Sequence, residues 1–97
     1  MAGTSRARTL VEDPLFSQQL SEICDIQYVD EALAALYWAL CTQPEVYPIV
    51  TRTKRLRLAK TDEYTRSGAT VPCLRVWFTI DDDDTVTLRS IDAIVAD

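Results

Sequence analysis

The feature that most limits the possible folds is a change in the spacing of apolar residues half-way along the chain. In residues 73–80 and 85–89 every second residue is apolar, and an acidic turn at residues 81–84 separates the two segments. Residues 54–60 alternate in the same way. Side chains of a strand point to opposite faces in turn, so this pattern predicts three antiparallel strands with one buried face. The residues expected on that face are Leu56, Leu58, Leu74, Val76, Phe78, Ile80, Val86 and Leu88.

The first half of the chain has helical spacing instead. Asp13 followed by Pro14 is typical of a helix start, because aspartate caps free N–H groups and proline suits the first helical position. Pro44 ends the second helical segment, since proline cannot continue the hydrogen-bond ladder. Residues 13–43 are therefore predicted to form two helices, and residues 1–12 an N-terminal arm or edge strand.

Together these segments predict one α+β domain over residues 1–97. Two N-terminal helices pack on a small antiparallel β-sheet, which is formed by a meander at residues 54–94. A chain of this length has too few residues for two independent cores. The longest apolar stretch is about half the roughly twenty residues that a membrane span requires. With no apolar segment after the first residues, we expect a cytoplasmic protein that does not contact membranes.

Three cysteines and one helical tryptophan bear on the chemistry and the core. Cys24, Cys41 and Cys73 are widely spaced in apolar surroundings, and the chain has no histidine, so we expect reduced, buried thiols and no metal. Trp38 follows Tyr37, which lies on the apolar stripe of the second helix, and is expected to be half-buried. No cofactor is expected, and a catalytic triad with histidine is excluded.

Charge is distributed unevenly along this acidic chain. The whole sequence has a net charge of −5. Residues 50–78 contain seven basic and two acidic residues, which gives this segment a charge of +5. Such a segment can bind an anionic partner locally, although the molecule as a whole repels it.

The alternation in the strands predicts that the basic side chains gather on one sheet face. That face suits phosphate and base contacts, because guanidinium groups bind phosphate oxygens and aromatic rings stack on bases. The alternative is an ordinary solvated sheet face on which Trp77 covers a neighbour on the adjacent strand. The residues expected on this face are Arg55, Arg57, Arg75, Trp77, Thr79, Thr87 and Arg89.

The order of these elements and several sequence strings resemble the RelE/ParE family of bacterial toxins. The strings are LRVWFTID at residues 74–81, TVTL at residues 85–88 continuing to Ile91, and the basic stretch at residues 50–60. The likeness extends over about residues 44–94, and residues 10–43 are compatible with it.

This resemblance implies the toxin of a type II toxin–antitoxin system, with a cognate antitoxin as its partner. RelE-like members cut mRNA in the ribosomal A site without a metal, so the ribosome and mRNA are further implied partners. By this resemblance, the catalytic residues of the mRNA interferase are Lys54, Arg57 and Arg75. Residues implied in binding RNA or a partner are Arg52, Arg55, Lys60, Trp77 and Arg89.

Two departures from the family pattern favour other functions. After Ile91 only Asp92 and Asp97 titrate, so the C-terminal catalytic tyrosine of RelE-like members has no counterpart. The net charge is also negative. The alternatives are a gyrase-inhibiting ParE-like toxin and a catalytically inactive RelE-like module that binds proteins. A stand-alone oligomeric domain, such as a homodimer, is a third hypothesis.

Overall fold

In the residues that the structure describes, the chain forms two helices and six strands, and this α+β class is the one that the sequence predicts. The computed structural model describes residues 7–26, 28–51, 55–62, 64–66, 68–82 and 84–94. The elements are β1 (Thr9–Glu12), α1 (Pro14–Ile23), α2 (Val29–Thr42), the 3-10 turn η1 (Pro44–Val46), β2 (Arg57–Lys60), β3 (Tyr64–Arg66), β4 (Ala69–Val71), β5 (Cys73–Ile80) and β6 (Thr85–Ile94). None of the described helices is long and apolar enough to cross a membrane.

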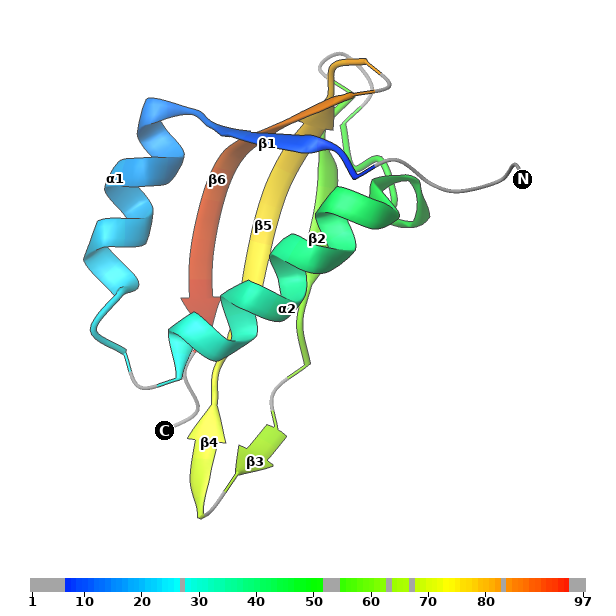
Figure 1. Cartoon of the computed structure of the whole chain (residues 1–97). Coiled ribbons are helices and arrows are strands. Elements are labelled where there is room, and N and C mark those ends of the chain that lie inside the picture. The colour runs from blue at the N-terminus through cyan, green and yellow to red at the C-terminus, as the bar shows by residue number, and fades with distance from the viewer. Residues whose placement is uncertain are drawn as a thin grey trace.

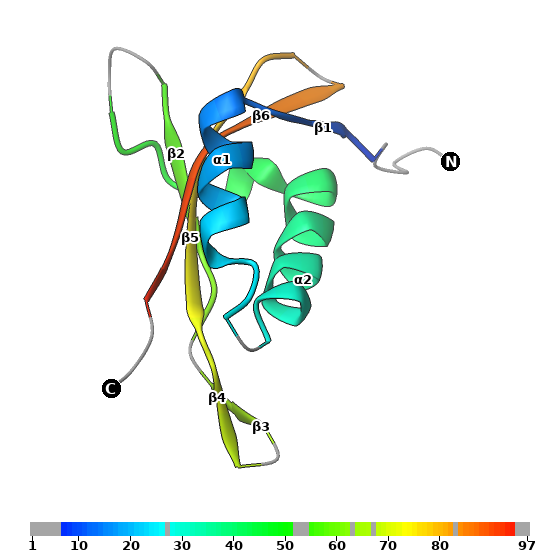
Figure 2. The ribbon, with the colours of Figure 1, turned by 90° about the vertical axis from the view of Figure 1, so that its left-hand side faces the viewer.

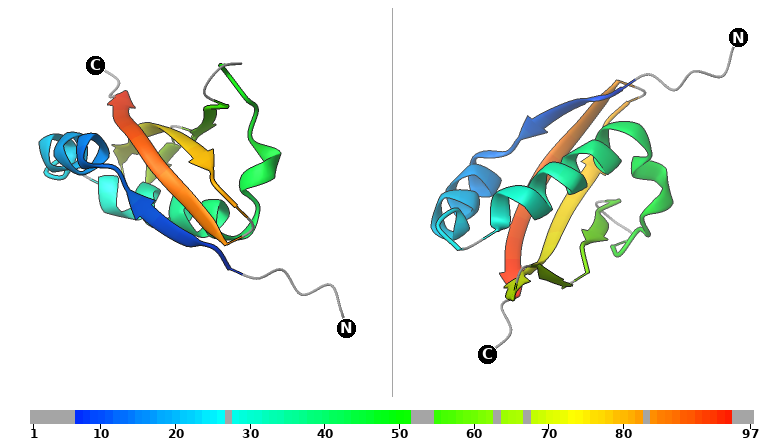
Figure 3. Two further views of the ribbon diagram at one scale, coloured as in Figure 1. Left: turned by 90° about the horizontal axis from the view of Figure 1, so that it is seen from above. Right: turned by 60° about the horizontal axis from the view of Figure 1, so that its bottom comes forward.

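Four of the strands form one mixed sheet in the order β1-β6-β5-β2 (Figure 1). The meander of β2, β5 and β6 is antiparallel as predicted, whereas β1 is an edge strand that runs parallel to β6 (Figure 3). The parallel pair follows from the connection, because two helices carry the chain from β1 across the sheet before the meander begins. Strands β3 and β4, which follow β2 and precede β5 along the chain, form a separate two-stranded hairpin.

Both helices lie on the same side of the sheet (Figure 2). Helix α1 runs beside β6 beyond the end of β1 (Figure 1), where Gln19 Oε1 accepts hydrogen bonds of 2.9 Å from the Ile91 N–H and the Ser90 hydroxyl. The side chain therefore satisfies backbone of β6 that β1 does not reach. We call the other face of the sheet, on which Trp77 lies, the open face.

The core lies between the helices and the sheet. As predicted, alternate residues are buried in β5 and in β6 as far as Leu88. The start of α1 is also as expected, with the Leu15 N–H donating to Asp13 Oδ1 at 3.0 Å. The buried hydrophobic residues are Phe16, Val29, Ala32, Leu33, Leu36, Leu40, Ala59, Val71, Leu74, Val76, Phe78, Val86, Leu88 and Ile91.

The predicted direction of the side chains in β2 is wrong. Arg57 lies opposite Phe78, Leu58 opposite Trp77 and Ala59 opposite Val76. Directly opposed residues of an antiparallel pair share a face, so Ala59 faces the helices and Leu58 faces the open side. The fully buried residue is Ala59, with an exposed fraction of 0%. The strand thus buries its smallest apolar side chain rather than its leucine.

Two further predictions about burial are wrong. Trp38 is 69% exposed rather than half-buried, because Leu36 and Leu40 face the core and Trp38 projects from the other side of α2. Cys24, which follows the last residue of α1, is exposed rather than buried. Cys41 and Cys73 are partly buried, and all three thiols are free.

The side chain of Tyr37 carries a buried hydroxyl group that lacks a hydrogen bond in the described part of the folded protein. Burial, with a contribution from the negative charge of Glu12, raises the pKa of Tyr37 from 10.0 to about 12. The unfolded chain therefore ionises first, and the free energy of unfolding falls as the pH rises from 10 toward 12.

Replacing Tyr37 with phenylalanine is expected to raise the free energy of unfolding by about 1 kcal/mol at neutral pH. The variant removes a buried hydroxyl that has lost water without gaining a partner, while it keeps the ring. Between neutral pH and pH 11 its free energy of unfolding should also fall less than that of the wild type, because the hydroxyl whose pKa is raised in the folded state is gone. Urea denaturation at both pH values measures both effects, and an equal alkaline loss in the two proteins would contradict the assignment.

Candidate binding groove on the open sheet face

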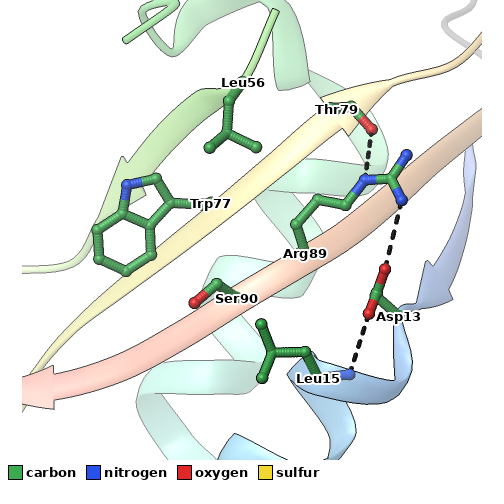
Figure 4. Close-up of a pocket in the computed structure, with 7 residues that line it drawn as sticks. All are labelled: Asp13, Leu15, Leu56, Trp77, Thr79, Arg89 and Ser90. Carbon is green, nitrogen blue, oxygen red and sulfur yellow. Dashed lines mark hydrogen bonds and ion pairs between the residues drawn. The ribbon is translucent and has the colours of Figure 1, made fainter. Parts of the chain in front are cut away.

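A groove of about 740 Å³ crosses the open face between the start of α1 and the segment that leads into β2 (Figure 4). In Figure 4, Leu56 and Trp77 lie on one side of the groove and Leu15 on the other, with Ser90 between them. The groove therefore combines apolar walls with a polar floor. The residues that line it are Asp13, Leu15, Leu56, Trp77, Thr79, Arg89 and Ser90.

A β-bulge places two successive residues of β6 in this groove. Trp77 pairs with Ser90, whereas the next residue, Phe78, pairs with Leu88, so Arg89 is the additional residue. The bulge interrupts the alternation of β6. Arg89 and Ser90 consequently both line the groove, while Leu88 and Ile91 on either side remain buried in the core.

Arg89 is held by groups from three parts of the chain. Its Nε donates to Thr79 Oγ1 at 3.1 Å, and its Nη1 lies 3.4 Å from Asp13 Oδ2. Its Nη2 is 3.8 Å from Asp81 Oδ1, which is beyond hydrogen-bonding distance. Asp81 also accepts hydrogen bonds from the hydroxyls of Thr79 and Thr87. One guanidinium thus lies between two carboxylates.

Arg75 forms the tightest ion pair on the open face. Its Nε donates to Asp92 Oδ1 at 2.8 Å and its Nη2 to Asp92 Oδ2 at 2.5 Å. The guanidinium also lies 5.3 Å from the centre of the Trp77 ring, within the range of a cation–π contact. The hydrogen bond to Asp92 raises the pKa of Arg75. The pair occupies the edge of the guanidinium that Nε and Nη2 form.

The structure brings together only part of the predicted site. Arg75, Trp77 and Arg89 share the open face, and Lys60 lies opposite Arg75 on the same face and is exposed. Arg57 lies on the other face, where its Nη1 donates to the carbonyl oxygens of Tyr47 at 2.6 Å and Glu45 at 3.2 Å. The predicted arginine face therefore draws on two described strands rather than three.

The remaining predicted site residues lie in the segment before β2. Arg55 is exposed and has a left-handed backbone conformation, with φ of 51°. Arg52 and Lys54 lie outside the described residues. Of the three residues predicted to be catalytic, the structure thus places Arg75 on the open face and Arg57 away from it, and does not describe Lys54.

Three features of the open face were not predicted from the sequence. Leu56 was expected in the core but lines the groove, and the second feature is Leu15, which also lines the groove and is 49% exposed. The third is Asp92 as the partner of Arg75. The alternation of β5 and β6 does indicate that charged residues of both strands share the open face, but it does not indicate which of them pair.

The groove has the apolar walls and paired charges of a binding surface. In the residues that the structure describes, no three Cys, Asp or Glu side chains gather closely enough to hold a metal ion. Apolar walls can receive a bulky side chain, and the paired charges can orient it.

No protein-family model matches this chain, and a comparison with curated proteins finds no match.

Proposed function

We propose that this protein is a RelE/ParE-like module that binds a partner protein through its open face and does not cut RNA. One observation supports this most directly. The arginines of the open face are already paired with the chain's own carboxylates, Arg75 with Asp92 and Arg89 with Asp13 and Asp81.

These ion pairs oppose RNA binding for two reasons. A phosphate of an RNA backbone is bound well by two N–H groups on one edge of a guanidinium, and Asp92 occupies the Nε–Nη2 edge of Arg75. The two guanidinium groups also face three carboxylates, so the paired cluster is formally negative. A cluster with this charge does not contribute the counterion release that gives nucleic-acid binding most of its affinity.

The same face has the composition of a protein interface. Tryptophan and arginine are enriched where binding energy concentrates, and Trp77 and Arg75 lie against each other here. Leu15 and Leu56 add apolar surface on opposite sides of the groove. The sequence resemblance supports the proposal further, because the partner that it implies, an antitoxin, is itself a protein.

An mRNA interferase is the second candidate, and Lys60 favours it. This lysine is exposed on the open face opposite Arg75, and it belongs to the basic segment at residues 50–78. A cation at this position can stabilise negative charge on a phosphate during attack by the 2′-hydroxyl.

The variant Asp92→Asn tests whether the ion pair suppresses RNA binding. It frees Arg75, and we expect the affinity for a short single-stranded RNA at low salt to rise about fivefold, with a steeper salt dependence. Folding should be retained, because a surface pair contributes within about 1 kcal/mol. Asp30→Asn makes the same charge change on α2 and is the matched control. Equal RNA affinity in the two variants would contradict this role of Asp92.

Cleavage of ribosome-bound mRNA then decides between the two candidates. We expect the wild-type protein to leave the mRNA intact, and its expression alone to leave cellular translation and DNA supercoiling unchanged. Cleavage that Arg75→Ala abolishes would instead establish the mRNA interferase. DNA damage with intact mRNA would point to gyrase, the target of the ParE-like alternative.

A further inference from the structure

The charge on the groove is uneven from one end to the other. At one end Asp13 and Asp81 flank Arg89, and the exposed Asp82 follows in the same turn. This end has a formal charge of −2. Toward the other end Arg75 and Asp92 neutralise each other, and the exposed Lys60 lies opposite Arg75. Because the chain as a whole is also acidic, with a net charge of −5, a partner with positive charge is attracted both at long range and at the groove.

The middle of the groove is apolar. Leu15 is 49% exposed, and Leu56 and Trp77 stand on the opposite side. Removing the apolar surface of Leu15 from water is favourable when another apolar group covers it. The volume of about 740 Å³ is in the range of pockets that enclose a bulky ligand group.

We propose that the groove takes a protein segment in which a bulky apolar side chain stands next to a lysine or arginine. This inference rests on the proposed function and specifies the chemistry of the partner. The apolar side chain packs between Leu15 and Trp77, and the cation binds Asp81. An acidic segment fits worse, because it meets two or three carboxylates at the end where it needs a cation.

The contacts of Arg89 show how the cation is received. Asp81 is its most distant partner, at 3.8 Å, whereas Thr79 at 3.1 Å and Asp13 at 3.4 Å are closer. An incoming ammonium or guanidinium group can therefore bind Asp81 while Arg89 keeps its two shorter contacts. Asp81 remains oriented during this exchange by the hydroxyls of Thr79 and Thr87.

Selection from a random-peptide phage library on the immobilised full chain tests this directly. We expect the enriched peptides to share a large apolar residue adjacent to lysine or arginine. Synthetic copies of these peptides, labelled with fluorescein, then give dissociation constants by anisotropy. Trp77→Ala should weaken their binding at least about 30-fold, because a central tryptophan is a typical hot spot. Trp38→Ala, which removes the exposed tryptophan of α2, should leave their binding unchanged.

The charge requirement has its own pair of variants. Asp81→Asn keeps a hydrogen-bond acceptor but removes the charge, and we expect it to weaken binding of the basic peptides about threefold to fivefold. Asp30→Asn removes a charge far from the groove and should have no effect. Leu56→Ala gives a second test of the apolar site should Trp77→Ala fail to fold.

The outcomes separate this inference from the proposed function. Groove-dependent peptides that are acidic, or that ignore the Asp81 charge, would overturn the inference and leave a protein-binding module. An absence of any peptide that depends on Trp77 or Leu56 would contradict the proposed function, and the inference with it. Basic, apolar peptides that lose affinity in both variants of the groove support both.

Discussion

A lysine introduced at position 59 is expected to unfold the protein, whereas a lysine at position 58 is expected to leave it folded. Ala59 is fully buried and lies opposite Val76, so the new ammonium group would have no partner and no water. Burying an unpaired charge costs several kcal/mol. A domain of this size has a free energy of unfolding of roughly 5–15 kcal/mol, and much of it would be lost.

Leu58→Lys is the matched control because it makes a similar change one residue away. Leu58 faces the open side opposite Trp77, where the lysine stem can lie along the ring with its charge in water. We expect a loss of about 1 kcal/mol. Urea denaturation followed by circular dichroism compares the two variants. The reverse order of stability would show that the register of β2 is wrong.

Truncation of Phe78 to alanine is expected to lower the free energy of unfolding by about 4 kcal/mol. The ring is fully buried at the centre of the sheet and meets Tyr47 edge-to-face, with 6.0 Å between the ring centres. Its removal loses apolar burial and leaves a cavity that the rigid strands on both sides cannot close.

Trp38→Ala provides the comparison, since it removes a larger aromatic side chain that is 69% exposed. Its effect on stability should be within about 0.5 kcal/mol. Chemical denaturation of both variants measures the difference. A loss below about 2 kcal/mol for Phe78→Ala would contradict its place in the core.

Local signals made the helices and the two long strands predictable. Asp13 caps α1 as expected because the cap depends on residues close in sequence, and α2 ends at Thr42 just before Pro44. β5 alternates over eight residues, which is long enough to establish its buried face. These elements determined the α+β class before any long-range contact was known.

β2 was mispredicted because four residues contain too little pattern. Its sequence RLAK has apolar residues at two adjacent positions, so the alternation favours either face equally. Leu58 was assigned to the core because, over residues 54–60, Leu56 and Leu58 alternate with Arg55 and Arg57. The pairing with β5 selects the alanine instead, and no local signal reports that pairing.

The ion pair between Arg75 and Asp92 depends on the bulge. Before it, Thr79 pairs with Thr87 and Ile80 with Val86, and a regular hairpin would continue to bring Ile91 opposite Arg75. The additional residue Arg89 shifts this register by one, so Asp92 becomes the partner. A single irregular residue thus determines which charges neutralise each other, and alternation alone cannot locate it.

The pairing of β1 with β6 determines when the fold can form during synthesis. Thr9 lies beside Thr85, so an early strand must wait for one of the last described strands before it has a neighbour. Until β6 leaves the ribosome, the helices also lack Val86, Leu88 and Ile91, against which the core is completed. Closing so long a loop makes folding slow relative to a helical bundle. The nascent chain therefore lacks its native core until β6 has been translated, and its apolar helix faces are exposed to aggregation until then.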